Sequence, residues 1–223
     1  LTARTGRDFK VGAVSARSKN KDRDLNLEGT DWYENPLDML EDDKLDVVLE
    51  LIGGEEGIAK DFVEAALKKG VAVVTANKAL LAKHGQYLAE LSENSGAPFY
   101  YEAAIAGGIP IVKSLKEGLV SSRISTIAGI LNGTCNFILT EMDASGADFE
   151  DVLKDAQDKG YAEADPTFDV DGIDAAHKIA LLAATGFGMR PEFEGLKIEG
   201  IRNITSEDIQ TASTLGYKIK LLA

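Results

Sequence analysis

Residues 46–75 read DVVLELIGGEEGIAKDFVEAALKKGVAVVT, and this stretch decides the fold that the sequence predicts. Asp46–Ile52 is a nearly continuous apolar run, as in a strand that is buried on both faces of a sheet. Glu56–Lys69 follows as a helix with one apolar stripe, and Gly70 is its expected end. Val71–Thr75 is a second apolar strand. The segment therefore predicts one β-α-β unit.

The alternation of strands and helices continues on both sides of this unit. KVGAVSA at 10–16 predicts an earlier strand, 79–95 a helix and 98–103 a further strand. This order predicts an α/β fold with a Rossmann-like, doubly wound parallel sheet. Ligands of such sheets bind at the carboxyl ends of the strands. Those ends are expected at Ser15–Lys19, Ile52–Gly54, Thr75–Lys78 and Glu102–Gly108.

The regular alternation of strands and helices ends at about residue 106. The pattern predicts a helix over 109–120, a strand over 123–131 and helices over 136–143, 149–159 and 172–185. A second domain of α+β type accounts for this mixture. We place the domains at 1–104 and 105–223.

Composition excludes several classes of function. The 223 residues are 44% hydrophobic and 27% charged, with no apolar run long enough to cross a membrane. A formal net charge of −13 argues against nucleic acid as a partner, because phosphate binding needs a basic surface. The single cysteine, Cys135, excludes an internal disulfide framework and fits a reducing cytoplasm. Two histidines and this cysteine, far apart in sequence, give no zinc signature.

The glycine-rich phosphate loop of dinucleotide-binding folds, G-x-G-x-x-G, does not occur in the sequence. Gly53-Gly54-Glu55-Glu56-Gly57 has the wrong spacing and two acids, and we interpret its glycines as turn and cap residues. Either the chain binds no dinucleotide, or the first β-α element lies outside this sequence. Only nine residues precede the strand at 10–16, which favours the second interpretation.

GYAEADPTFDVDGIDAAHK at 160–178 is the most informative motif. Asp174 and Lys178 stand at i and i+4 on one helix face, ahead of an apolar continuation. A solvated acidic loop with an ordinary helix ion pair is one explanation. A partly buried lysine beside carboxylates is also a candidate acid or base.

Three further motifs each allow a structural and a functional interpretation. TANK at 75–78 is a helix start or a ligand-binding strand end, and EAAIAGGIP at 102–110 allows close packing or wraps a cation with carbonyls. In GILNGTCNF at 129–137, the turn before the helix could hold a carboxylate through its amides. Cys135 there is a candidate nucleophile or, as we favour, a packed side chain.

These four motifs, in this order, resemble the homoserine dehydrogenase family from residue 10 to the end of the chain. The resemblance implies an oxidoreductase that interconverts L-homoserine and L-aspartate 4-semialdehyde, in threonine, methionine and isoleucine biosynthesis. It implies a partial dinucleotide-binding domain followed by a substrate-binding, catalytic and dimerisation domain, in a homodimer. Relative to the family pattern, we expect the N-terminal glycine loop and a C-terminal segment to lie outside this sequence.

The same resemblance implies residue roles. Lys178 is implied as the proton donor, with Asp174 as its partner. The implied substrate-binding residues are Glu163, Asp169, Tyr161, Gly133 and Thr134. The implied cofactor-binding residues at the strand ends are Lys78, Thr75, Asn77, Ile52 and Gly53. A structural sodium ion is implied at Glu102 and the carbonyls of Ile105, Gly107 and Ile109.

The strand at 10–16 leads into Arg17-Ser18-Lys19, and no acid follows until Asp22. An acid at this place usually binds the ribose 2′-hydroxyl of NAD, whereas cationic and hydroxyl donors suit the 2′-phosphate of NADP. We therefore expect NADP(H) to be preferred over NAD(H), with Arg17 as the main determinant.

Two other functions compete with this one. A semialdehyde dehydrogenase would act through a Cys135 thioester, but it leaves the Asp174–Lys178 pair without a role. A non-catalytic oligomerisation module would keep the fold without a phosphate loop.

Overall fold

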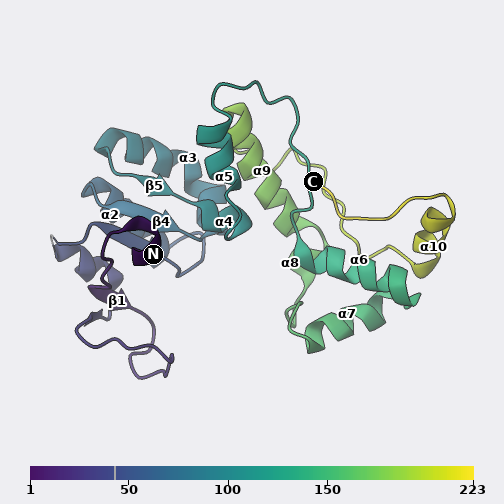
Figure 1. Ribbon diagram of the computed structural model, residues 1–223, viewed down its shortest axis with the longest axis horizontal. Coiled ribbons are helices and arrows are strands. Elements are labelled where there is room, and N and C mark those ends of the chain that lie inside the picture. The colour runs from purple at the N-terminus through teal and green to yellow at the C-terminus, as the bar shows by residue number, and fades with distance from the viewer. Residues whose placement is uncertain (43) are drawn as a thin grey trace. The chain divides into compact units, whose positions relative to one another are not determined.

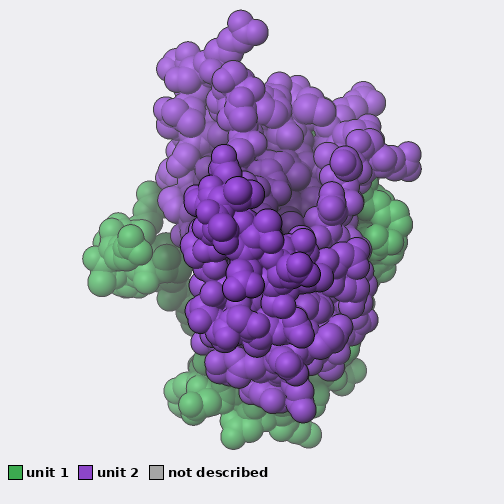
Figure 2. All heavy atoms as spheres, turned by 90° about the vertical axis from the view of Figure 1, so that its right-hand side faces the viewer, with its two compact units in different colours: residues 1–101 green, residues 102–223 purple. Residues whose placement is uncertain are grey.

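The computed structural model describes residues 1–42 and 44–223. It divides into two compact units, Leu1–Tyr101 and Glu102–Ala223, which Figure 2 shows in different colours. The division lies a few residues before the boundary expected from the sequence. No helix of the described residues is both long and apolar enough to cross a membrane.

Unit 1 is an α/β unit whose strands all pair in parallel, as the sequence predicts. β3 (Val47–Glu50), β4 (Ala72–Thr75) and β5 (Phe99–Tyr100) form one sheet in that order. β1 (Ala13–Ser15) pairs with β2 (Asp31–Tyr33), a strand that the sequence pattern does not indicate. The parallel sheet is therefore in two pieces within the described residues.

Two helices, α2 (Ile58–Lys68) and α3 (Lys78–Ser95), cover one face of the larger sheet (Figure 1). They bury Phe62, Val63, Leu80 and Leu88. Residues of β3 alternate accordingly: Val48 and Glu50 are buried, whereas Val47, Leu49 and the following Leu51 are exposed. A short helix, α1 (Thr2–Thr5), and a 3₁₀ turn, η1 (Pro36–Glu41), complete the unit.

Unit 2 is mainly helical. Its core lies between α6 (Gly133–Ser145) and α7 (Phe149–Asp158), where Ile138, Leu139, Met142, Leu153 and Ala156 are buried. The remaining elements are α4 (Glu102–Ala106), α5 (Ile111–Lys113), the π-helical turn η2 (Ser114–Gly118), α8 (Thr167–Val170), α9 (Ile173–Phe187) and α10 (Ser206–Thr214).

The structure corrects several of the predicted elements. The strand expected over 98–103 ends at Tyr100, and Glu102 begins α4 instead. The helix expected over 109–120 is divided between α5 and η2. The helix expected from residue 136 already begins at Gly133, because Asn132 caps it.

The strand expected over 123–131 is the largest correction, because the structure assigns none there. A strand requires a ladder of partners. Gly129 and Ala223 do exchange both backbone hydrogen bonds, at 2.8 and 3.0 Å. This one pair of residues does not extend into a ladder within the described chain.

Gly200 brings a loop directly against the turn between α8 and α9. A Cβ atom added at Gly200 would lie 2.2 Å from the Val170 carbonyl oxygen and 2.4 Å from Asp171 Cα. The next residue, Ile201, donates its N–H to the same Val170 oxygen at 2.8 Å. A glycine is therefore required at 200 by close backbone approach.

Candidate active site

The beginning of α6 organises a cluster of polar side chains in unit 2. Asn132, only 3% exposed, accepts the Cys135 N–H with Oδ1 at 2.8 Å and so caps the helix. Its Nδ2 donates to Asp169 Oδ1 at 2.7 Å and to Asp174 Oδ2 at 2.9 Å. One amide therefore holds two carboxylates from different elements in one place.

Lys178 joins this cluster from α9. Its Nζ lies 2.7 Å from Asp174 Oδ2 and donates to the Leu131 carbonyl oxygen at 2.9 Å. The Lys178 side chain is 23% exposed and that of Asp174 is 9% exposed, so the pair lies at the edge of the core. An ammonium has three N–H donors. With one carboxylate and one carbonyl as partners, Lys178 is suited to donate to an additional acceptor.

Four of the other predicted substrate-binding residues, Gly133, Thr134, Tyr161 and Asp169, lie in or contact the segment that begins α6. Thr134 donates its hydroxyl to the Tyr161 carbonyl at 3.0 Å, which ties the loop at 160–166 to α6. Gly133 is the first residue of α6, and Asp169 is held by Asn132. The Glu163 side chain is exposed, and the Glu163 backbone carbonyl accepts a hydrogen bond from Gln157 Nε2 at 3.0 Å.

Cys135 is fully buried, and its thiol donates to the Asp169 carbonyl at 3.1 Å. Burial, with further contributions from Asp169 and Asp174, raises the pKa of Cys135 to about 12. The thiol is therefore protonated at neutral pH. This argues against the thioester mechanism, which needs a thiolate.

In unit 1, the predicted cofactor residues lie where β3 and β4 end. Thr75 is fully buried, and Asn77 caps α3 by accepting the Leu80 N–H at 3.1 Å. Asn77 also donates to the Gly54 carbonyl at 2.7 Å, while Lys78 opens α3. Ile52 and Gly53 form the facing loop after β3.

Sequence reasoning missed two polar side chains that organise these sites, Asn132 and Glu50. Glu50 is fully buried and accepts the Thr75 hydroxyl at 2.6 Å. An acid inside an otherwise apolar strand was the available signal for Glu50. Asn132 stood within a motif that we had singled out, but its two carboxylate partners are 37 and 42 residues away.

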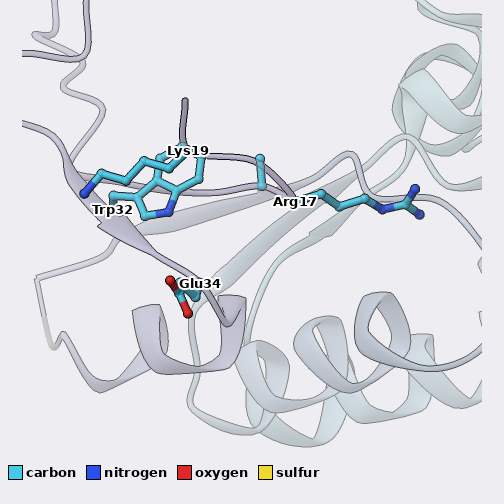
Figure 3. A pocket seen from close by; sticks show the side chains of 5 residues that line it. Arg17, Lys19, Trp32 and Glu34 are labelled. Carbon is cyan, nitrogen blue, oxygen red and sulfur yellow. The ribbon is translucent and has the colours of Figure 1, made fainter. Parts of the chain in front are cut away.

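A pocket lies at the carboxyl ends of β1 and β2, lined by Ala16, Arg17, Lys19, Trp32 and Glu34. Figure 3 shows that the Arg17 and Lys19 side chains extend in opposite directions, with Lys19 on the side of Trp32. Arg17 and Lys19 were expected from the sequence. Glu34 is an addition, because it follows β2 and not the strand at 10–16.

Glu102, the predicted sodium ligand, accepts the N–H groups of Val112 and Lys113 at 2.7 and 2.9 Å. It therefore holds the start of α5, and the Ile109 carbonyl already accepts from Ile111 at 2.8 Å. No group of three or more acidic, histidine or cysteine side chains among the described residues could hold a metal ion.

Comparisons with known proteins agree on one family. The homoserine dehydrogenase family model matches residues 110–223, and the model of the homoserine dehydrogenase NAD-binding domain matches residues 1–102. A homoserine dehydrogenase of Neisseria gonorrhoeae is 47% identical over 222 residues, which are 100% of this chain and 51% of that protein. The chain thus spans about half the length of the curated relatives it matches.

Solved structures give the same result. The crystal structure of a homoserine dehydrogenase from Thiobacillus denitrificans superposes with a TM-score of 0.90 at 49% identity, over 99% of this chain and 51% of that one. The structure of a hyperthermophilic archaeal homoserine dehydrogenase in complex with NADPH has a TM-score of 0.68 at 31% identity. The match covers 76% of this chain and 51% of the archaeal chain. The chain belongs to the homoserine dehydrogenase family.

Proposed function

We propose that the full-length protein interconverts L-homoserine and L-aspartate 4-semialdehyde with a nicotinamide cofactor, in the biosynthesis of threonine, methionine and isoleucine. The cluster of Lys178, Asp174, Asn132 and Asp169 carries this proposal. It combines a proton donor with a carboxylate partner in the domain that matches the family model.

Lys178 would act on the substrate oxygen. When bound, the cofactor supplies a hydride to the aldehyde carbon. The Lys178 ammonium then stabilises the developing alkoxide and donates its proton to that oxygen. Asp174, at 2.7 Å, holds the ammonium and balances its charge. Glu163 would bind the substrate ammonium, with Asp169, Tyr161, Gly133 and Thr134 nearby.

We propose NADP(H) as the preferred cofactor, bound by Arg17 and the strand-end residues Ile52, Gly53, Thr75, Asn77 and Lys78. The pocket at β1 and β2 fits an adenosine phosphate in its donor set, since Arg17 and Lys19 are cationic and Trp32 is aromatic. Glu34 opposes the preference, because a carboxylate in the same pocket repels a phosphate. The NADPH complex of the archaeal relative supports the general class of cofactor.

The remaining assignments concern ions and assembly. A structural sodium ion at Glu102 and the carbonyls of Ile105, Gly107 and Ile109 fits the single carboxylate, although that carboxylate already accepts two N–H groups. A homodimer and a cytoplasmic location stay predictions. A non-catalytic oligomerisation module is the alternative, because the sequence contains no G-x-G-x-x-G.

The test is steady-state kinetics on the full-length protein with L-homoserine and each cofactor, at one fixed ionic strength. We expect turnover, with a higher kcat/KM for NADP⁺ than for NAD⁺. Arg17→Ala should lower the NADP⁺ value selectively. Absence of turnover would favour the non-catalytic module. A preference for NAD⁺, or an equal loss for both cofactors in the variant, would refute the role of Arg17.

A further inference from the structure

Glu50 is a charged side chain at the end of the apolar strand β3, with none of its surface exposed. Burial of a carboxylate is unfavourable unless donors surround it. Here Oε1 accepts the N–H groups of Ile52 at 2.7 Å and Gly53 at 3.0 Å, and Oε2 accepts the Thr75 hydroxyl at 2.6 Å. Three donors to one carboxylate make it an acceptor at both oxygens.

The hydrogen bonds continue from Glu50 into the next strand end. Thr75 is its register partner on β4, and the Thr75 oxygen accepts the Asn77 N–H at 3.0 Å. Asn77 in turn donates to the Gly54 carbonyl at 2.7 Å. The loop after β3 and the start of α3, where Lys78 lies, are therefore tied together through one buried carboxylate.

The loop after β3 is turned in a defined direction by these bonds. The described residues contain no cis peptide bond, so each carbonyl points opposite to the N–H of the same peptide group. Because the N–H groups of Ile52 and Gly53 point to Glu50, the carbonyls of Leu51 and Ile52 point away from it. Leu51 and Ile52 are 73% and 43% exposed. Positive φ values at Gly53 (81°) and Gly54 (87°) allow the chain to turn back.

We infer that Glu50 is a positioning residue for the cofactor, an inference that rests on the proposed function. It fixes the loop at 51–54 so that outward carbonyls accept from hydroxyl or amide N–H groups of the bound cofactor, and it does not touch the reacting atoms. Through Thr75 and Asn77 it also fixes the position from which Lys78 begins α3.

Glu50→Gln in the full-length protein tests this. Glutamine keeps the shape but places an NH₂ group against either two N–H donors or the Thr75 hydroxyl. We expect hydrogen exchange at the Ile52 and Gly53 amides to become at least about tenfold faster, as loss of a charged hydrogen bond implies. The Kd and KM for NADP(H) should rise by about tenfold for the same reason, with kcat little changed.

Glu55→Gln is the matched control, since it makes the same chemical change in the same loop. Glu55 is exposed and pairs with Lys83 at 3.0 Å, so its loss should change neither exchange nor Kd appreciably. If Glu50→Gln does not fold, Thr75→Val removes one donor to the carboxylate and should raise Kd in the same direction.

The outcomes separate the two hypotheses. Faster exchange together with a raised Kd supports the inference. Faster exchange with an unchanged Kd, or no protection of these amides in the wild type, overturns it. A wild-type protein with protected amides but no affinity for NAD(P)(H) refutes the proposed function itself, and the positioning role with it.

Discussion

At the scale of single residues, the cluster of Asn132, Asp169, Asp174 and Lys178 depends on the neutral amide of Asn132. Its NH₂ group lies between Asp169 and Asp174, whose mutual repulsion it reduces by donating to both. Among the described ion pairs, Lys178 supplies a positive charge to Asp174. The cluster thus combines one cation, two carboxylates and one neutral donor.

Lys178→Ala in the full-length protein should lower kcat by about 10²–10⁴-fold, which is the usual loss for a proton donor. Cofactor affinity should remain nearly unchanged. Lys159→Ala is a matched control, because Lys159 forms a similar i, i+4 pair with Asp155 at 2.6 Å, but on an exposed surface. A Lys178 variant that retains most of its kcat would remove this lysine from the mechanism.

Asn132→Asp should make stability depend on pH. Aspartate keeps the shape and the cap, but it adds a third carboxylate beside those of Asp169 and Asp174. Repulsion among the ionised carboxylates destabilises the folded state, and protonation at low pH relieves it. The variant is therefore closest to the wild type at low pH and loses stability as the pH rises. Urea unfolding at pH 5 and pH 8 measures this, and an equal difference from wild type at both would contradict it.

Cys135 should resist alkylation in the native state. Its pKa is raised to about 12 by burial and by neighbouring carboxylates, so iodoacetamide at pH 8.5 should react far more slowly than in urea. The pKa of an unfolded cysteine thiol is about 8.5. The contribution of Cys135 to stability should therefore fall as the pH rises from that pKa towards the pKa of the folded state. Native labelling as fast as unfolded labelling would restore Cys135 as a candidate nucleophile.

The sequence predicted the residues whose partners are local, and missed those whose partners are distant. The spacing of Asp174 and Lys178 predicted a pair on one helix face, and the structure places them at 2.7 Å. Asn132 and Glu50 could be recognised only from partners brought close by the tertiary fold, such as Thr75, 25 residues beyond Glu50.

At the scale of elements, periodicity predicted helices better than isolated strands. The apolar stripe of α2 and the position of β3 agree with the sequence pattern. The expected burial of β3 on both faces is wrong for the described residues, because Val47 and Leu49 are exposed. The segment at 123–131 has a strand-like pattern but no described ladder partner, so its secondary structure depends on contacts that a local pattern does not encode.

Gly200→Ala should destabilise unit 2, because its Cβ would lie 2.2 Å from the Val170 carbonyl oxygen. Overpacking of this kind costs about 1–3 kcal/mol, and more where backbone atoms must move. Gly195→Ala is the control, since its Cβ would meet only Glu192 Cγ at 3.6 Å. Chemical unfolding measures both variants, and equal free energies of unfolding would show that the loop at Gly200 moves freely.

At the scale of the whole molecule, two features oppose each other. The net charge of −13 keeps copies apart. Leu49 in β3 and Leu51 just after it are 65% and 73% exposed, and they favour association. Electrostatic repulsion becomes short-ranged at high salt, because the Debye length is about 3 Å at 1 M and about 30 Å at 0.01 M. The balance should therefore shift towards association as salt increases.

We expect the 223-residue chain to self-associate more strongly in 1 M than in 0.01 M salt, as measured by sedimentation. Leu49→Ser should weaken this association. Leu25→Ser is the matched control, because Leu25 is 69% exposed but lies outside the strands. Equal effects of the two substitutions would exclude the face of β3 as the associating surface.

The reciprocal hydrogen bonds of Gly129 and Ala223 have a consequence for the timing of synthesis. These residues are 94 positions apart, so Gly129 cannot pair until all the intervening chain has been made. At about 5–20 residues per second, that interval lasts on the order of 5–20 s. The β-α-β unit at 46–75 joins strands only 25 positions apart and closes much earlier. In a nascent chain, the β-α-β unit would therefore be folded while Gly129 still lacks its hydrogen-bond partner. During that interval the segment around Gly129 is most exposed to chaperones and proteases.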